Sequence, residues 1–369
     1  MASAADTDFM MMALTLAERG LGQTAPNPAV GCIIVANGVV VGRGWTQPGG
    51  RPHAETVALA HAGDKARGAT AYVTLEPCAH HGKTGPCAQA LIEAGVARVV
   101  GAVADPDPRV AGRGFAMLEN AGIEVVEDVC MSRAVYLNLG FFLKVTDERP
   151  LVTLKIASSV DGRTATKSGH SRWITGDAAR QRGHLLRATH DAIMIGSATA
   201  IVDDPILTCR LPGLEERSPV RIVADGRLRL PLTSKLVRDA ARSPVLIFTF
   251  PDGDADRRAA FVGCGVELID VPPVASTGLM DMQAAMKLLA GRGLTRVLVE
   301  GGARLASSLM RAHLVDRVEW FRSSSILGGD GYPAIAALGV EKVDDAPKML
   351  MTSQIDLGAD TLSSYVMRS

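Results

Sequence analysis

Hydrophobic and polar positions in the first forty-five residues follow two different periods. Met10, Leu14 and Ala17 recur at helical spacing, so we predict a helix that Asp6 or Thr7 caps and Gly20 ends. Residues 29–45 then hold two β-rich runs on either side of Asn37-Gly38, a dipeptide that favours a type I′ turn. The chain is therefore expected to begin with a helix and a β-hairpin.

Short helical and β-rich runs alternate after the hairpin, which indicates αβ units around one sheet. We predict, in order, a helix at 54–62, a strand at 70–75, a helix at 87–95, a strand at 98–103, a loop at 105–108 and a helix–strand pair that ends near 126. An apolar helical run follows and ends at Asp147-Glu148-Arg149-Pro150. We interpret this run as the connection between two domains, 1–147 and 148–369, with Phe141 and Phe142 packed between them.

The second half repeats the alternation over a longer stretch, which indicates a mainly parallel α/β sheet. We predict a helix from Asp177, with Asp177 as its N-cap, and a loop at 198–210. The predicted strands are at 151–157, 191–197, 219–225, 245–249, 266–269 and 296–300. After about Val340 the pattern favours no particular element.

Composition narrows the function classes. The chain has 369 residues, of which 47% are hydrophobic, and its 39 basic residues equal its 39 acidic ones. Such a balance disfavours a long nucleic-acid footprint and suits a small-molecule substrate. The sequence has neither a leader-like N-terminus nor a long apolar run, so we expect a cytoplasmic protein without a membrane partner. Its six scattered cysteines argue against a disulfide framework.

Four residues between 53 and 87 predict zinc chemistry. His53, Cys78 and Cys87 supply one imidazole and two thiolates, and a three-ligand set leaves the fourth tetrahedral position open, as in catalytic zinc sites. Cys87 opens a predicted helix, where a thiol is biased toward its metal-binding thiolate form. Glu55 follows His53 by two residues and is the natural proton carrier.

Zinc nucleobase deaminases combine a His-x-Glu motif with a Pro-Cys-x-x-Cys motif. This chain matches the first motif, but eight residues separate Cys78 from Cys87. A structural zinc is the alternative, and it would need a fourth ligand from His80, His81 or Cys32. We favour a catalytic site, because a structural one gives Glu55 no role.

A candidate anion site lies in the second domain. Residues 297–305 read as a strand, a turn at Gly301-Gly302 and a helix, an arrangement that presents backbone N–H groups to a nucleotide phosphate. The pattern is neither Gly-x-Gly-x-x-Gly nor a Walker motif, so a plain tight turn explains it equally well. The sequence Asp203-Asp204-Pro205 could belong to a binding site or could simply form a capped turn, and the sequence favours neither.

Longer motifs resemble a known family, the bifunctional deaminase–reductases of riboflavin biosynthesis. Residues 26–32, 52–55 and 74–87 of this chain are similar to the family's deaminase half. Its reductase half is similar to residues 154–163, 171–175, 185–187, 199–210 and 300–302. The two halves stand in the same order and cover most of the chain. The resemblance implies an α/β fold in which a dihydrofolate-reductase-like domain follows an N-terminal cytidine-deaminase-like zinc domain.

Two consecutive reactions follow from that resemblance. The first is zinc-dependent hydrolytic deamination of 2,5-diamino-6-(5-phosphoribosylamino)pyrimidin-4(3H)-one to 5-amino-6-(5-phosphoribosylamino)uracil. The second is NADPH-dependent reduction of the ribosyl group to ribityl. The family also implies a homo-oligomer, either a dimer or a tetramer.

The resemblance assigns residues to each task. Zinc would be held by His53, Cys78 and Cys87, with Glu55 as the proton donor. NADPH would contact Ala157, Trp173, Thr199, Asp203, Gly302, Ala303, Arg304, Leu305, Ala306, Ser307 and Ser308. Substrates would contact Asn27, His80 or His81, Lys155, Ser171, Arg187, Leu207, Arg210 and Glu300. The chain departs from the family pattern at Thr46, often His, at Gly85, usually Pro, and at Asp107, often Asn.

Three other functions remain open at this point. A deaminase of tRNA or free nucleosides would share the first domain but would not need a phosphate-binding second one. A deaminase with a degenerate second domain would lose residues such as Lys155, Asp203 and Glu300, which are intact here. A zinc-stabilised binding module would tolerate the loss of the Glu55 carboxylate.

Overall fold

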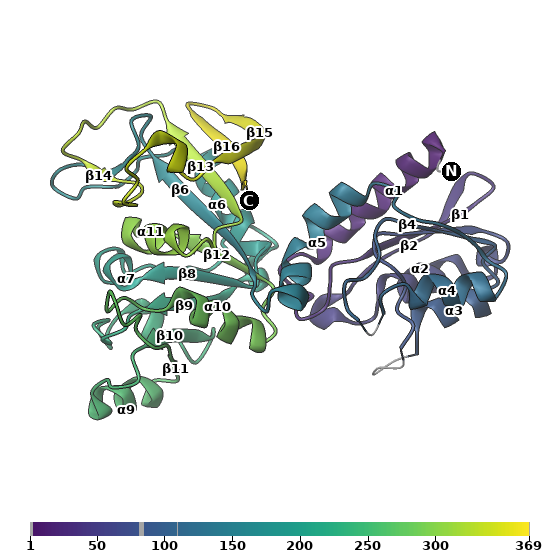
Figure 1. Ribbon diagram of the computed structural model, residues 1–369, viewed down its shortest axis with the longest axis horizontal. Coiled ribbons are helices and arrows are strands. Elements are labelled where there is room, and N and C mark those ends of the chain that lie inside the picture. The colour runs from purple at the N-terminus through teal and green to yellow at the C-terminus, as the bar shows by residue number, and fades with distance from the viewer. Residues whose placement is uncertain (1–2, 81–84, 109, 369) are drawn as a thin grey trace. The chain divides into compact units, whose positions relative to one another are not determined.

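The chain divides into two compact units in the computed structural model, which describes residues 3–80, 85–108 and 110–368 (Figure 1). The units are Met1–Arg149 and Pro150–Ser369, so the division falls close to the predicted one after residue 147. Within these described ranges, every helix is too short or too polar to cross a lipid bilayer.

The first unit contains a five-stranded sheet in the order β2-β1-β3-β4-β5. Strand β1 pairs antiparallel with β2 and β3, while β3, β4 and β5 run parallel. The strands are β1 (Gly31–Ala36), β2 (Val39–Trp45), β3 (Thr70–Val73), β4 (Arg98–Gly101) and β5 (Glu124–Val126). The helices are α1 (Ala4–Ala17), α2 (Ala54–Ala62), α3 (Cys87–Glu93), α4 (Arg113–Asn120) and α5 (Met131–Thr146). The predicted hairpin is confirmed, and Asn37 and Gly38 both have the positive φ of a type I′ turn.

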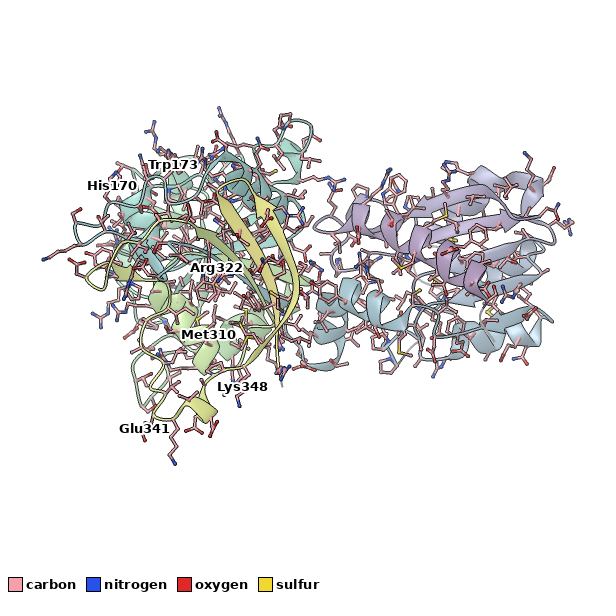
Figure 2. All side chains as sticks on the ribbon, turned by 90° about the horizontal axis from the view of Figure 1, so that it is seen from above. His170, Trp173, Met310, Arg322, Glu341 and Lys348 are labelled. Carbon is pink, nitrogen blue, oxygen red and sulfur yellow. The ribbon has the colours of Figure 1, made fainter. Side chains whose placement is uncertain are left out.

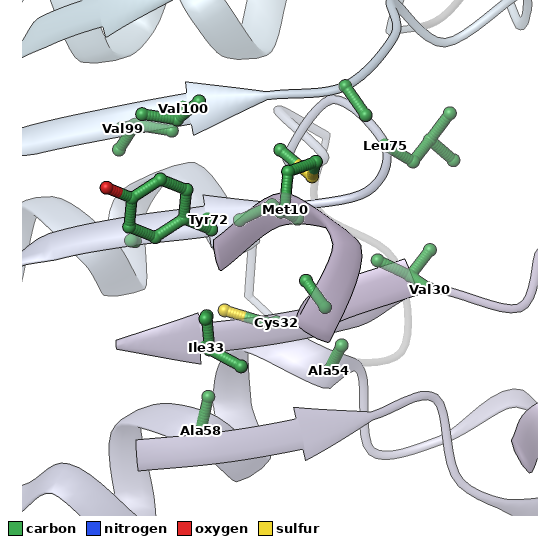
Figure 3. Packing of buried hydrophobic residues seen from close by; sticks show 14 of the residues in the cluster. Met10, Val30, Cys32, Ile33, Ala54, Ala58, Tyr72, Leu75, Val99 and Val100 are labelled. Carbon is green, nitrogen blue, oxygen red and sulfur yellow. The ribbon is translucent and has the colours of Figure 1, made fainter. Parts of the chain in front are cut away.

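Glycines let α1 and α2 approach the hairpin closely from opposite faces. A Cβ on Gly31 would lie 1.9 Å from the Ala13 carbonyl of α1, and one on Gly44 would lie 2.1 Å from the Ala54 carbonyl of α2. Gly44 pairs with Cys32, the residue next to Gly31, and neighbouring residues in a strand face opposite sides of the sheet. The two helices therefore cover opposite faces and share one core with the strands, as Figure 3 shows.

Helix α5 corrects the prediction for residues 127–149. It is an integral helix of the first unit, because Ala134 and Leu137 are buried in that unit's core and Phe141 and Phe142 pack against the same core. Its buried Asn138 accepts a hydrogen bond from the Ala29 amide and donates one to the Ala29 carbonyl. An apolar run followed by a charged break is typical of a connection, but here the apolar face is used within one domain.

The cap predicted for the first helix is also wrong in detail. Ser3 is the N-cap of α1, and Asp6 is the third helical residue of a capping box. The Asp6 carboxylate is buried and accepts two hydrogen bonds from Arg98 on β4, at 2.7 and 3.0 Å, and one from the Tyr72 hydroxyl on β3. This ion pair fixes α1 to two strands of the sheet, and Arg98 holds the pKa of Asp6 well below its usual range.

The second unit is built on a nine-stranded sheet in the order β11-β10-β9-β8-β12-β6-β13-β16-β15. The seven strands from β11 to β13 in this order run parallel to one another. Strand β16 pairs antiparallel with β13 on one side and with β15 on the other. Its strands are β6 (Leu151–Ser158), β8 (Ala192–Gly196), β9 (Val220–Ala224), β10 (Val245–Thr249), β11 (Glu267–Asp270), β12 (Arg296–Glu300), β13 (Arg317–Ser323), β15 (Met349–Leu357) and β16 (Asp360–Met367). A separate two-stranded sheet joins β7 (Arg163–Ala165) to β14 (Tyr332–Pro333). The helices are α6 (Asp177–Ala188), α7 (Ser197–Asp203), α8 (Lys235–Arg238), α9 (Ala255–Gly263), α10 (Met282–Gly291) and α11 (Ala303–Arg311).

Two local predictions in this unit need correction. Gly176, rather than Asp177, is the N-cap of α6, and its amide donates to Asp360 at 2.6 Å. The predicted loop at 198–210 begins with helix α7, which stops where Asp204 adopts a left-handed conformation before Pro205. Proline disfavours a helical conformation in the residue before it, so the helix ends there. The C-terminal hairpin of β15 and β16 had no counterpart in the sequence prediction.

Loss of the Asp6 charge tests how α1 is attached. The Asp6→Asn substitution leaves the half-buried Arg98 with only the exposed Glu124 as a carboxylate partner, so we expect the first unit to lose about 2 kcal/mol of stability at pH 7. Because the folded pKa of Asp6 is depressed, its stabilisation is present above the ordinary carboxyl pKa of about 3.9 and is lost as the pH falls further. Calorimetry at pH 7 and pH 3 should therefore show a smaller difference at pH 3. Asp8→Asn, on an exposed residue of the same helix, is the control, and an equal effect of both variants would contradict this account.

Candidate active sites

The three predicted zinc ligands meet beyond the carboxyl end of β3. His53 immediately precedes α2, Cys78 follows β3, and Cys87 is the first residue of α3. Their ligand atoms all lie within 4.8 Å of one another, and His53 Nδ1 is 3.3 Å from the Cys87 sulfur. One imidazole and two sulfurs at this spacing fit a zinc ion with an open fourth position.

Glu55 is buried in the first turn of α2 beside this ligand set. Burial, followed by the negative charge at Cys78, raises the pKa of Glu55 to about 7. A hydrogen bond from Cys87 lowers the pKa of the Cys78 thiol to about 4, which favours the thiolate form that binds metal. The site therefore combines a metal-binding thiolate with a carboxyl group able to exchange a proton near neutral pH.

Glu76 supports this site, a role that the sequence prediction missed. Its buried carboxylate accepts hydrogen bonds from the amides of Asp105, Gly112 and Gly114, at 3.1, 2.9 and 2.7 Å. It thereby fixes the loop after β4, which brings Asp105 near Cys78. Burial raises the pKa of Asp105 to about 6. Asp107 is buried in the same loop, and its amide donates to Asp105 at 2.8 Å.

The predicted pyrimidine contacts lie on the loops that approach the zinc ligands. Asn27 is half-buried, and its side-chain amide donates a hydrogen bond to the Gly50 carbonyl at 2.9 Å. Gly50 precedes the zinc ligand His53 by three residues. His80 follows Cys78 by two residues, and its buried Nδ1 has no hydrogen-bond partner among the residues that the structure describes. His81, the other candidate, lies outside the described residues.

A second charged cluster lies at the carboxyl ends of β6 and β12. Glu300 ends β12 and pairs in register with Lys155 of β6, whose Nζ lies 3.4 Å from the Glu300 carboxylate. Arg187 of α6 donates to both oxygens of the same carboxylate, at 2.7 and 3.0 Å. Burial opposes ionisation of Glu300, but the charges of Arg187 and Lys155 outweigh it and hold the pKa of Glu300 well below its usual range. Three residues predicted to contact substrate are therefore brought together.

The segment that carries Leu207 and Arg210 adjoins the same cluster. Arg187 uses a third N–H group to donate to the Thr208 carbonyl at 3.0 Å. Leu207 is buried in the core, whereas the Arg210 side chain is exposed. A guanidinium has five N–H groups, so Arg187 retains two for a ligand.

The glycine turn after β12 has the geometry of a backbone anion site. Gly301 and Gly302 both have positive φ, and a Cβ on either would lie 3.3–3.4 Å from Thr199 of α7. The turn leads into α11, whose first N–H groups lack partners within the helix. The side chains of Leu305 and Ala306 belong to the core, and the Ser307 hydroxyl donates to carbonyls. Of the predicted NADPH segment, Gly302, Ala303, Arg304 and Ser308 are at least partly exposed.

The remaining predicted NADPH residues lie on other segments. Trp173 is 71% exposed on the segment before α6, stacked under the Arg180 guanidinium at 4.7 Å, and Figure 2 labels it at the surface. It lines a pocket of about 530 Å³ with residues from β13 and the β15–β16 turn. Ser171 precedes it, and Ala157 lies near the end of β6. Asp203 is the last residue of α7, and partial loss of solvent raises its pKa despite the nearby positive charge of Arg172.

Two family models match the chain. Residues 3–103 match the cytidine and deoxycytidylate deaminase zinc-binding region, and residues 150–362 match the RibD C-terminal domain. The two matches fall on the two structural units, one on each.

Full-length relatives and solved structures are similar over nearly the whole chain. The chain is 42% identical to riboflavin biosynthesis protein RibD of Escherichia coli, covering 96% of this chain and 97% of that protein. It is 40% identical to RibD of Actinobacillus pleuropneumoniae, covering 99% and 96%. Form 1 of RibD from Acinetobacter baumannii superposes with a TM-score of 0.88 at 38% identity, covering 99% of each chain. A diaminohydroxyphosphoribosylaminopyrimidine deaminase/5-amino-6-(5-phosphoribosylamino)uracil reductase from Thermotoga maritima superposes with a TM-score of 0.84 at 34% identity, again covering 99% of each.

Zinc content tests the ligand set directly. We expect about one zinc per purified wild-type chain and less than about 0.1 after Cys87→Ser, because the loss of one of three ligands leaves too few donors for tight binding. Elemental analysis after dialysis measures both values. Cys264→Ser, on an exposed cysteine of the other unit, is the matched control. Full zinc in the Cys87→Ser protein would rule out this ligand set.

Proposed function

The chain belongs to the RibD family of riboflavin biosynthesis enzymes, and we propose that the residues described above carry the family's two activities, one in each unit. The enzyme deaminates 2,5-diamino-6-(5-phosphoribosylamino)pyrimidin-4(3H)-one and then reduces the ribosyl group of the product to ribityl. The observation that carries our assignment of the first activity is the buried Glu55 carboxyl beside a His-Cys-Cys set whose ligand atoms lie within 4.8 Å.

Glu55 is the proton carrier of the deamination. Zinc, when bound by His53, Cys78 and Cys87, supplies a Lewis acid that lowers the pKa of a water molecule. Glu55 takes one proton from the water that attacks C2 and delivers it to the ring nitrogen. It then takes the second proton from the hydroxyl now on C2 and delivers it to the departing amino group. The C–N bond breaks, ammonia leaves and a carbonyl forms at C2. A carboxyl pKa near 7 suits both acceptance and donation of this proton.

Lys155, Arg187 and Glu300 form the substrate end of the reductase site. NADPH, when bound, supplies the hydride that reduces C1′ of the opened, imine form of the ribose. Glu300 keeps Arg187 oriented, and the two remaining N–H groups of Arg187, with Arg210, suit the ribose phosphate. Gly302 and Ala303 at the start of α11, together with Thr199, would hold the cofactor's phosphates. A homo-oligomer and a cytoplasmic location stay predictions from the sequence.

Replacement of Glu55 by glutamine tests the proton carrier. The amide cannot accept a proton, so ammonia release should fall by at least about 10³-fold while zinc content stays near wild type. NADPH oxidation with the deaminated product should be unchanged, because it uses the other unit. Glu119→Gln, on an exposed helix residue of the first unit, is the control. Full deaminase turnover by zinc-loaded Glu55→Gln protein would contradict this mechanism.

Replacement of Glu300 by glutamine tests the second site. The change leaves Arg187 and Lys155 as two neighbouring cations without their carboxylate, so both should lose their orientation toward substrate. We expect kcat/KM for NADPH oxidation to fall by about 100-fold, roughly 2.7 kcal/mol of transition-state stabilisation, with ammonia release unaffected. Glu341→Gln changes an exposed carboxylate of the same unit and should have no effect. Unaltered reduction by the Glu300→Gln protein would show that this cluster is not the substrate site.

A further inference from the structure

Two residues of helix α6, Arg187 and His184, form hydrogen bonds to the described segment 208–210, and His184 has no role in the proposed function. Arg187 donates to the Thr208 carbonyl at 3.0 Å. His184, one helical turn earlier, accepts a hydrogen bond from the Arg210 amide on Nδ1 at 3.3 Å. Its own carbonyl accepts from the Cys209 thiol at 3.5 Å. His184 therefore contacts this segment through both its ring and its backbone carbonyl.

The surroundings of His184 keep its ring neutral. Burial, then the positive charges of Arg187 on α6 and Arg210 on the segment itself, lower its pKa to about 4. The charge of Glu300 on β12 and a hydrogen bond to the Thr208 carbonyl each raise the pKa of His184, but they do not offset the lowering. A neutral imidazole has one acceptor nitrogen, and here the Arg210 amide occupies it.

The same charges explain why the segment needs to be held. Arg187 is neutralised by Glu300, whereas Arg210 forms no ion pair with any residue in the described part of the chain. The positive charges of both guanidinium groups reach His184 and lower its pKa, so the two groups bear on the same end of α6. A phosphate dianion would bring two such groups together, but only if the Arg210 backbone is already in place.

We infer that His184 is a positioning residue of the reductase, which fixes the Arg210 backbone so that Arg187 and Arg210 bind the substrate phosphate together. The inference rests on the proposed function for the roles of the two arginines. His184 itself touches protein rather than substrate, so its loss should weaken substrate binding and leave the hydride step nearly unchanged. This role requires a neutral His184 ring, because a protonated Nδ1 cannot accept a hydrogen bond from the Arg210 amide.

Steady-state kinetics of NADPH oxidation with the deaminated substrate test this role at pH 7. His184→Ala should raise KM by about tenfold with kcat within about twofold of wild type, since an unmade hydrogen bond in a binding segment costs about this much. His184→Asn, whose amide oxygen can take the place of Nδ1, should restore KM to within about threefold. Fluorescence titration should give unchanged NADPH affinity for both variants.

Three results would overturn the inference: a fall in kcat at constant KM, weakened NADPH binding, or equal defects in the alanine and asparagine variants. His313→Asn, on an exposed histidine of the same unit, is the matched control. Ammonia release by each preparation reports that the first unit is intact, and unchanged NADPH affinity reports the same for the second. Absence of NADPH oxidation in the wild-type protein would instead count against the proposed function.

The pH dependence supplies a second readout. As the pH falls from 7 toward about 4.5, wild-type KM should rise relative to that of His184→Asn, because only the imidazole becomes protonated. The substrate phosphate titrates identically in both assays, so the ratio of the two KM values isolates His184. A ratio that stays constant over this range would contradict the requirement for a neutral ring.

Discussion

The chemistry of this protein depends on where its parallel strands end. In the first unit the polar residues follow β3 and β4, the parallel pair at which the sheet changes from antiparallel to parallel pairing. In the second they lie on β6 and at the end of β12, which are paired in register through Lys155 and Glu300. Parallel strands bring their carboxyl ends to one edge, so residues far apart in sequence meet there. The buried cores on the faces of each sheet hold these ends in fixed positions.

Each site contains a buried glutamate, and the neighbours of each determine what it can do. Glu55 lies beside the Cys78 thiolate, so burial and like charge both favour its protonated form and suit it to carry a proton. Glu300 lies between two cations that outweigh the same burial cost, so it stays ionised and orients Arg187 and Lys155. The same residue type thus serves proton transfer in one unit and fixed electrostatic orientation in the other.

Local sequence predicted those features that depend on neighbouring residues. The Asn37-Gly38 turn, the helix that starts after His53 and the strand that ends at Glu300 all follow from residues within a few positions. The three hydrogen bonds to Glu76 come from amides 29 to 38 positions later, and no periodicity reveals such a contact. His184 lies on the helix predicted from Asp177, but no local pattern marks its contact with residues 208–210. Helix α5 was misread because an apolar face does not say which domain it will pack against.

Simultaneous measurement of ammonia and NADPH during a single time course tests the central claim, that two units act in order on one substrate. Starting from the diaminopyrimidine phosphoribosyl substrate, we expect ammonia to appear first, NADPH oxidation to begin after a lag, and one NADPH to be consumed for each ammonia released. Without NADPH, ammonia release should continue to completion. NADPH oxidation that precedes ammonia, or that proceeds without it, would contradict the account.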